Sequence, residues 1–310
     1  MPASADGIAA AVRIIAAGGT VAVPTETVYG LAARADSDAA VAEIYRAKGR
    51  PDFNPLIVHV PDLAAAERLA LFDGTARALA AVFWPGALTM VLPRRAAAPL
   101  AAAVSAGLPT VALRCPAHAV MQALLRECGL PLAAPSANRS GGVSPTSAAH
   151  VIASLGDRVG LVLDDGETAQ GIESTIVAVR PGGGWSILRP GPIGETQLAE
   201  VIGTRPDAGA VAGGEASIEA PGQLASHYAP GKPVRLDATR ADADEFLIGF
   251  GGVAGHVSLS TAGDLAQAAA RLYACLHLAA DAAQPRIAVA PIPAEGIGIA
   301  INDRLGRAAA

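Results

Sequence analysis

The chain has 310 residues, of which 52% are hydrophobic and 16% charged, and its formal net charge is −5. This length is sufficient for two domains of ordinary size, and the composition is far from that of a disordered chain. The negative charge argues against a nucleic-acid binder with a basic coat, although it is compatible with a local cationic cleft.

The location of the protein is expected to be cytoplasmic. The three cysteines, Cys115, Cys128 and Cys275, form no CxxC motif, which favours a reducing compartment. The longest uncharged run, residues 96–113, is rich in alanine and broken by prolines, so we expect no membrane span. No secretory signal opens the chain.

The first predicted elements are a helix and a buried strand. The helix begins near Ile8 with Asp6 as its N-cap and ends at Gly18-Gly19. The β-branched run Thr20–Val23 predicts a strand, which Pro24 ends.

Three polar side chains follow this strand, namely Thr25, Glu26 and Thr27. Open α/β sheets bind ligands beyond the ends of their strands, so these residues are candidates for ligand contact. An ordinary polar turn is the alternative, and this stretch alone leaves both open. Glu26 and Thr27 would either stabilise the turn or help to position magnesium.

A constrained loop carries the next candidates. It lies between a helix that runs from Ser37 to Gly49 and a strand over residues 56–60, and it contains Lys48, Arg50 and Asn54. Isolated loop cations are usually solvated. Cations on a loop constrained by Pro51 and Pro55 suit a polyphosphate, with which charge-assisted hydrogen bonds are strong.

Polar residues also end or interrupt later strands. Arg114 ends a strand over residues 110–114 and needs a partner if it is buried, either a substrate carboxylate or a protein one. Ser136 and Asn138 form either a turn or a ligand loop. His59 lies inside a buried strand, where we expect core packing.

The remaining pattern predicts a mixed α/β sheet followed by a smaller unit. Ser144-Pro145 fits a helix start, and Pro181–Gly184 suits a hairpin between strands. The expected parts are a domain over residues 1–203, a linker over 204–232, and a small α/β, Rossmann-like domain over 233–310. The clearest helix of this last part carries Leu265, Leu272 and Leu276 on one face.

Several familiar forms of catalysis have no motif in the chain. There is no P-loop, no CxxC, and no Ser-His-Asp order or paired-carboxylate site. Asp164–Glu167 could hold magnesium, but an acidic turn is the more common explanation. Small hydroxyl, amide and cationic groups at strand ends suit an enzyme that works through phosphate chemistry, with little protein nucleophilic catalysis.

Short motifs carry a resemblance to a known family. In order, they are Gly19–Leu31, Lys48-x-Arg50, Asn54–His59, Trp84–Thr89, Ala134–Asn138, Ser174–Val177, Leu188–Pro192, Ser226–Pro230, Glu295–Gly298 and Asn302–Arg307. Together they resemble the YrdC-like family of threonylcarbamoyl-adenylate synthases in its long, two-domain form. The family fold is a twisted open α/β sheet with a cationic cleft.

The resemblance implies a reaction and its partners. L-threonine, bicarbonate or carbon dioxide, and ATP with Mg²⁺ would give threonylcarbamoyl-AMP and pyrophosphate. The product would pass to tRNA threonylcarbamoyl-transferase proteins, which form threonylcarbamoyladenosine next to the anticodon, and a weak contact with tRNA is expected.

The resemblance also implies roles for individual residues. Thr25, His59, Arg114 and Ser174 would surround the threonine, with Arg114 on its carboxylate. The ATP site would comprise Lys48, Arg50, Asn54, Thr110, Ser136, Asn138, Ser144, Arg189 and Tyr228. Of these, Lys48 and Arg50 would be catalytic, because they neutralise developing charge, and no protein metal ligand is assigned.

Two other functions remain as alternatives. A cationic cleft could belong to an RNA-binding module without enzymatic activity, although the net charge counts against it. A carbamoyl-transfer domain with another acceptor, as in hydrogenase-maturation proteins, would be expected to carry acylphosphatase and zinc-finger-like segments, which we do not find.

Overall fold

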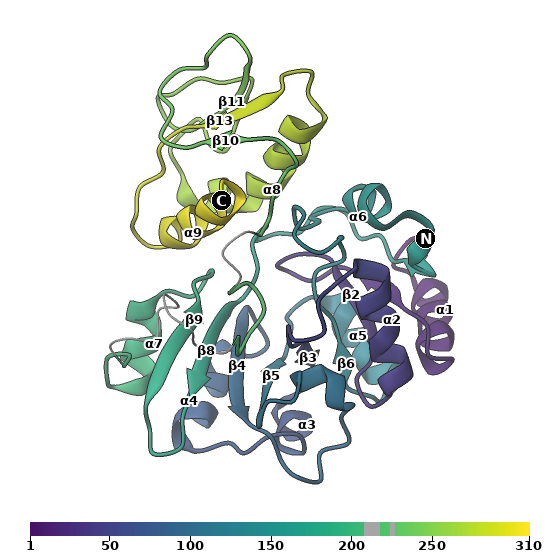
Figure 1. The fold of residues 1–310 in the computed structure, drawn as a ribbon. Helices are drawn as coiled ribbons and strands as arrows, with labels where there is room; N and C mark the ends of the chain where they lie inside the picture. The colour runs from purple at the N-terminus through teal and green to yellow at the C-terminus, as the bar shows by residue number, and fades with distance from the viewer. Residues whose placement is uncertain (208–217, 224–226) are drawn as a thin grey trace.

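The computed structural model describes residues 1–207, 218–223 and 227–310, and it has two lobes, each built on its own sheet (Figure 1). The strands of the larger lobe are β1 (Val21–Val23), β2 (Gly30–Arg34), β3 (Ile57–His59), β4 (Leu88–Pro93), β5 (Thr110–Arg114), β6 (Leu132–Ala133), β7 (Leu161–Val162), β8 (Thr175–Val179) and β9 (Trp185–Arg189). Its helices are α1 (Ala5–Ala16), α2 (Asp38–Lys48), α3 (Leu63–Glu67), α4 (Gly74–Phe83), α5 (Ala119–Cys128), α6 (Ala148–Leu155) and α7 (Glu195–Ile202), with 3₁₀ turns at Ala102–Ser105 and Gly156–Arg158.

The larger sheet is mixed, as the sequence predicts. Its nine strands lie in the order β7-β1-β2-β6-β3-β5-β4-β8-β9. Strands β3 and β5 are parallel and place His59 directly opposite Arg114. The hairpin predicted at Pro181–Gly184 joins the antiparallel pair β8 and β9. Strand β2 was not expected, because its alanine-rich sequence lacks β-branched residues; it forms through antiparallel pairing with β1.

Alternation along the first strands gives the sheet two buried faces. Val21 and Val23 pack on one face with Ile8 and Ile15 of α1, whereas Ala22 packs on the other with the cluster that includes α2. A sheet covered on both faces leaves the ends of its strands, and the loops beyond them, as the place for ligand-binding side chains. Among the described residues, no helix is long and apolar enough to cross a bilayer.

Two predicted helix caps are wrong. The N-cap of α1 is Ser4, whose side chain accepts from the amide of Gly7, so Asp6 falls inside the first turn. Helix α6 begins at Ala148 with Ser147 as its N-cap. Ser144 is therefore not a helix start, and its hydroxyl has a different partner, described below.

The smaller lobe is a parallel four-stranded sheet with two helices. Its strands are β10 (Val234–Arg235), β11 (Glu245–Gly249), β12 (Val257–Ser258) and β13 (Arg286–Val289), in the order β10-β13-β11-β12, and its helices are α8 (Leu265–Asp281) and α9 (Gly298–Ala308). The predicted helix α8 is confirmed. Helix α9 was missed because its buried face includes the charged residue Arg304, which interrupts the apolar pattern.

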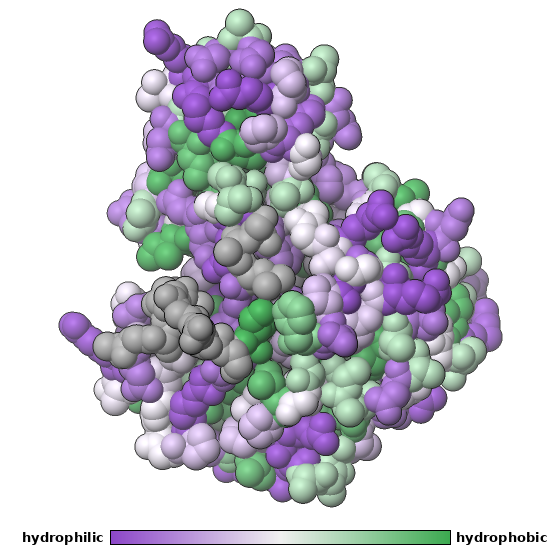
Figure 2. All heavy atoms as spheres, viewed as in Figure 1, coloured by the Kyte–Doolittle hydropathy of each residue, from purple (hydrophilic) through white to green (hydrophobic). Residues whose placement is uncertain are grey.

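Both helices of the smaller lobe lie on the side that faces the larger lobe (Figure 1). Figure 2 shows hydrophilic side chains over much of the outer surface of this lobe. The linker expected over residues 204–232 includes residues 208–217 and 224–226, which lie outside the described part, as does Ser226 of the predicted Ser226–Pro230 motif. The domain boundaries at 203 and 232 stay predictions.

Candidate active site

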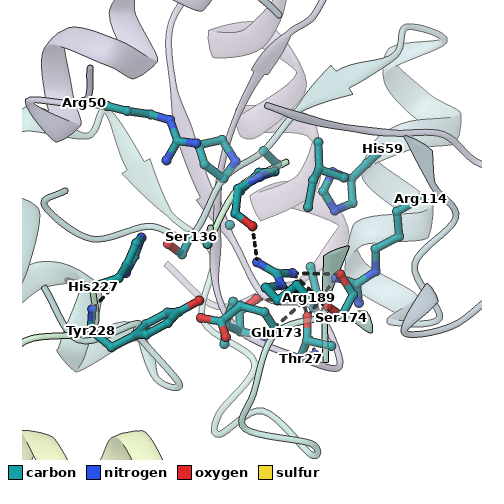
Figure 3. Close-up of a pocket in the computed structure, with 18 residues that line it drawn as sticks. Thr27, Arg50, His59, Arg114, Ser136, Glu173, Ser174, Arg189, His227 and Tyr228 are labelled. Atoms are coloured by element: carbon teal, nitrogen blue, oxygen red, sulfur yellow. Dashed lines mark hydrogen bonds between the residues drawn. The ribbon is translucent and has the colours of Figure 1, made fainter. Parts of the chain in front are cut away.

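A small cavity lies where the ends of several strands meet the end of the expected linker (Figure 3). Its lining includes three arginines, Arg50, Arg114 and Arg189, and two histidines, His59 and His227. The volume is about 50 Å³. Ligand pockets are typically roughly 300–1,000 Å³, so the cavity is smaller than most of them.

Arg114, at the end of β5, is held by three hydrogen bonds. It donates to Glu26 Oε1 at 2.7 Å, to Thr27 Oγ1 at 2.9 Å and to the carbonyl of Gly86 at 3.2 Å. Burial on its own raises the pKa of Glu26, but the charge and hydrogen bond of Arg114 outweigh it and the net pKa is lowered. Glu26 and Thr27, which had no assigned role, therefore orient Arg114.

His59 lies beside Arg114 on the same side of the cavity (Figure 3). It is buried, and its Nδ1 has no hydrogen-bond partner within the described residues. Burial and the charge of Arg114 lower the pKa of His59 to about 3, so the ring is neutral at pH 7. The expectation of core packing was incomplete, because this buried ring also lines the cavity.

The loop after α2 places Arg50 in the cavity wall. Its guanidinium donates to Asn54 Oδ1 at 2.6 Å and to the carbonyl of Pro55 at 2.9 Å. Burial lowers the pKa of Arg50 to about 10, so it stays charged at neutral pH. Asn54 itself does not line the cavity, and its function in this structure is to orient Arg50.

Lys48 lies behind the cavity. Its ammonium donates to the carbonyls of Ser136 and Asn138 at 2.5 and 2.6 Å, and the residue is buried. Burial, and then the charge of Arg50, hold the pKa of Lys48 well below its usual range. Lys48 thus fixes the loop that brings Ser136 to the cavity.

The opposite wall is built on β8 and β9. Arg189 donates to the carbonyl of Ser174 at 2.9 Å and to its Oγ at 3.1 Å. Ser174 Oγ is also 2.8 Å from Thr89 Oγ1. Gly222 packs against this wall with a φ of 85°, and a Cβ there would lie 2.8 Å from Arg189 Cδ. The close approach therefore requires glycine.

The end of the linker closes the cavity with Tyr228. This tyrosine has a φ of 63°, an uncommon conformation for a residue with a Cβ, so surrounding contacts must maintain it. Its ring stacks on that of Tyr273 at 5.6 Å between centroids, and the guanidinium carbon of Arg304 lies 5.5 Å from its centroid. Both contacts come from the smaller lobe.

Glu173 is the acidic residue of the wall. Its Oε1 accepts from Ser144 Oγ at 2.6 Å, and its Oε2 accepts from Tyr273 OH at 2.8 Å and from Arg304 Nε at 2.9 Å. Burial alone raises the pKa of Glu173, but the charges of Arg304 and Arg189 and these hydrogen bonds lower it to about 2. The carboxylate is ionised at neutral pH.

Eight of the predicted residues line the cavity. They are Thr25, Arg50, His59, Arg114, Ser136, Ser174, Arg189 and Tyr228. The structure does not place five others in its lining, namely Lys48, Asn54, Thr110, Asn138 and Ser144. Asn138 is engaged through its amide with the carbonyls of Arg139 and Gly142, and Thr110 lies at the far end of β5 from Arg114.

Sequence reasoning assigned no role to Glu173, His227, Tyr273 and Arg304, although His227 and Arg304 lie within the motifs Ser226–Pro230 and Asn302–Arg307. Glu173 and His227 each adjoin a residue that was identified, Ser174 and Tyr228, and this adjacency was the available signal. Tyr273 and Arg304 come from the smaller lobe, 100 and 131 residues along the chain from Glu173. No local pattern reveals such a contact.

The described residues include no cluster of three potential metal ligands. Within residues 1–207, 218–223 and 227–310, no group of three or more His, Cys, Asp or Glu side chains could hold one. The single carboxylate of the cavity lining, Glu173, already accepts three hydrogen bonds. In the Asp164–Glu167 segment, Asp164 Oδ1 accepts from the amide of Gly166, as in an acidic turn.

Comparison with protein families identifies both lobes. Residues 13–191 match the family described as "Telomere recombination" (Sua5_yciO_yrdC). The mixed sheet with its arginine-lined cavity is thus a domain of the Sua5, YciO and YrdC class. Residues 193–310 match the family described as "Threonylcarbamoyl-AMP synthase, C-terminal domain".

Individual relatives cover nearly the whole chain. The threonylcarbamoyl-AMP synthase of Bacillus subtilis is 40% identical over 97% of this chain and 92% of its own length. That of Pyrococcus abyssi is 37% identical over 96% and 92%. The crystal structure of P. abyssi Sua5 complexed with L-threonine covers 97% of this chain and 94% of its own, with a TM-score of 0.89 and 34% identity.

The chain therefore belongs to the two-domain, Sua5-type family of threonylcarbamoyl-AMP synthases. The resemblance noted from the short motifs is confirmed, as is the predicted fold class.

Proposed function

We propose that this protein joins L-threonine, bicarbonate or carbon dioxide, and ATP into threonylcarbamoyl-AMP, with release of pyrophosphate. The observation that carries the proposal is the cavity lined by Arg50, Arg114 and Arg189, in a chain that matches the synthase family in both lobes. The L-threonine in the P. abyssi structure supports the assignment of an amino-acid substrate.

The threonine end of the cavity would be the side of Arg114 and His59. Arg114 uses three of its N–H groups on protein acceptors, which leaves others for a substrate carboxylate. The neutral ring of His59 and the hydroxyl of Ser174 can hydrogen-bond the amine and hydroxyl of threonine. The hydroxyl of Thr25 lines the cavity but donates to the carbonyl of Val28 at 2.7 Å and accepts from the amides of Thr27 and Val28, so it would contact threonine only by giving up one of these bonds. The chemistry of these groups matches a small zwitterion with a hydroxyl.

The ATP end would be the side of Arg50, Ser136, Arg189 and Tyr228. Two arginines held by protein acceptors can bind phosphate oxygens without further reorganisation. Lys48, Asn54, Asn138 and Ser144 contribute behind this surface, because each holds a residue or loop of the wall, while Thr110 stays assigned to ATP by family resemblance alone.

The reaction would proceed by assembly. The ammonium of threonine first loses a proton to water, the neutral amine adds to carbon dioxide, and the adduct releases a second proton to water. An oxygen of the resulting carbamate then attacks the α-phosphorus as pyrophosphate leaves. The carbamate oxygen is already anionic, so this attack needs no general base. Arg50 would neutralise charge that develops on the phosphates. Mg²⁺ would enter as part of the ATP complex.

Downstream, the product would pass to tRNA threonylcarbamoyl-transferase proteins, with at most a weak contact between this chain and tRNA. These partners follow from family membership and not from a surface of this molecule. The match of residues 193–310 to the synthase C-terminal domain favours this function over an RNA-binding module or a carbamoyl transferase with another acceptor.

The test is pyrophosphate release by the purified protein. With Mg-ATP and bicarbonate present, we expect release that depends on added L-threonine and yields threonylcarbamoyl-AMP by mass spectrometry. Release that is the same with and without threonine contradicts the proposal. Salt-sensitive binding of tRNA without any threonine-dependent release would favour the RNA-binding alternative.

A further inference from the structure

The cavity has one lining residue of the wrong sign for a nucleotide site. Among the described residues that line it, Glu173 is the only acidic one. It is 6% exposed and ionised at neutral pH. A buried carboxylate in the wall repels the phosphates of ATP unless a fixed cation compensates its charge.

Arg189 lies near this carboxylate, but the arginine that contacts it directly comes from the other lobe. Arg304, on α9, is fully buried and donates through Nε to Glu173 Oε2 at 2.9 Å. Its Nη1 donates to Asp303 Oδ2 at 2.7 Å, and its Nη2 has no partner within the described part of the chain. Arg304 does not itself line the cavity, so it acts through the residues that it touches.

Arg304 also contacts Tyr228, a second residue of the cavity wall. Its guanidinium carbon lies 5.5 Å from the ring centroid of Tyr228, within the range of a cation–π contact. Tyr273 of α8 contacts both Tyr228, by ring stacking, and Glu173, by a hydrogen bond. One buried arginine thus joins the carboxylate and the tyrosine that together form one side of the cavity.

We propose that Arg304 is a positioning residue of the active site, supplied by the smaller lobe, which neutralises Glu173 and supports Tyr228 so that the cavity accepts the polyanion ATP. The inference deepens the proposed function and rests on it for the identity of ATP. The smaller lobe is then part of the nucleotide site and not only an appendage to it.

Loss of Arg304 should affect the KM for ATP and the KM for threonine unequally, which a merely structural role of Arg304 would not do. ATP carries several negative charges, whereas threonine is a zwitterion with no net charge. An uncompensated Glu173 therefore weakens ATP binding far more than threonine binding. In Arg304→Met we expect the KM for ATP to rise about tenfold or more, and the KM for threonine to stay within about threefold.

The double variant Glu173→Gln/Arg304→Met provides the decisive comparison. It replaces the buried ion pair by neutral side chains of similar volume, which proteins often tolerate. We expect its KM for ATP to return to within about threefold of the wild type. A double variant as impaired as Arg304→Met overturns the proposal, as does an Arg304→Met variant with an unchanged KM for ATP.

Folding controls keep the test decisive. If Arg304→Met fails to fold but the double variant folds, the double variant alone decides, by its KM for ATP. Arg304→Lys keeps a cation at this position and is expected to raise that KM less than Arg304→Met does; an equal or greater rise contradicts the proposal. Arg235→Met, which breaks the ion pair with Glu245 in the same lobe away from the cavity, should leave the KM for ATP unchanged.

The wild-type assay separates the two hypotheses. A wild type without threonine-dependent pyrophosphate release overturns the proposed function. An active wild type with an unaffected Arg304→Met variant overturns only the role of Arg304. Calorimetric titration of both proteins with Mg-ATP measures the nucleotide affinity directly, so the role of Arg304 is decided even if turnover is absent.

Discussion

Two buried carboxylate–arginine pairs border the same cavity in opposite orientations. In the first, Arg114 lines the cavity and Glu26 holds it from behind at 2.7 Å. In the second, Glu173 lines the cavity and Arg304 holds it from behind at 2.9 Å. The first pair lies within the larger lobe, whereas the second joins the two lobes.

The member of each pair that lines the cavity determines what the pair does there. Arg114 retains donors that a substrate can use, so the pair presents a fixed cation to an anionic group. Glu173 has three donors on its two oxygens and offers little to a ligand, so its pair mainly prevents a repulsive charge. Replacement of the first pair by neutral side chains should abolish threonine binding, whereas replacement of the second by neutral side chains should leave ATP binding nearly unchanged.

The largest expected effect is that of Arg114→Met. We expect kcat/KM for threonine to fall about 100-fold or more, because charge-assisted hydrogen bonds to the substrate are lost. Steady-state pyrophosphate release at varied threonine measures it. The variant also leaves Glu26 buried without its cation, which costs about 3–5 kcal/mol of folding free energy.

A double variant separates these two consequences. Glu26→Gln/Arg114→Met removes the uncompensated charge and should recover much of the stability, measured by urea unfolding, but none of the activity. If this neutral pair supports near-wild-type turnover of threonine, Arg114 is not a substrate-binding residue and the contrast between the two pairs is lost.

Glu26→Gln alone should have an intermediate effect. Glutamine can still accept a hydrogen bond from Arg114, but it orients the guanidinium less strongly. We expect a rise of about three- to tenfold in the KM for threonine with little change in kcat. A fall in kcat at constant KM would instead place Glu26 in the chemical step.

The pH dependence of stability should reveal the pair between the lobes. The pKa of Glu173 is lowered from its ordinary value of 4.5 to about 2, so its contribution is complete above pH 5 and is lost as pH falls towards 2. The contribution is roughly 3 kcal/mol at most. Urea unfolding between pH 7 and pH 3 should show a steeper loss in the wild type than in Glu173→Gln, and equal slopes would contradict the shift.

The smallest effect is expected for a solvent-exposed pair of the same chemistry. Glu43 and Arg46 form an ion pair on the surface of α2, with side chains 43% and 69% exposed. Water and salt screen such a pair, so Glu43→Gln should change the unfolding free energy by less than about 0.5 kcal/mol. A change of the size expected for Glu173→Gln would show that burial is not what distinguishes these pairs.

The sequence predicted the parts of the site that local patterns encode. Arg50 and Asn54 each precede a proline of one loop, and Arg114 ends an apolar strand, so each could be recognised from its neighbours. Lys48 was recognised too, but the sequence did not predict that its side chain points away from the cavity. Two backbone carbonyls from a loop distant in sequence accept its hydrogen bonds and determine this orientation. The sequence around Ser144 predicted a helix cap, but its hydroxyl donates a hydrogen bond to the carboxylate of Glu173.

The parts that the sequence did not predict depend on contacts between distant segments. Strand β2 forms because β1 and β6 lie on either side of it, not because its alanine-rich sequence favours a strand. Arg304 lies on the apolar face of α9 because its charge is paired across the lobes. A buried charge looks unfavourable in isolation, and only the partner that folding brings to it explains its place.

In the proposed function, Arg114 binds the carboxylate of L-threonine in this cavity. Calorimetric titration of the wild type with L-threonine and with L-threoninol, in which a hydroxymethyl group replaces that carboxylate, tests it most directly. We predict at least about tenfold weaker binding of L-threoninol by the wild type, and a much smaller difference in Arg114→Met. Equal affinity of the wild type for the two ligands would contradict the claim.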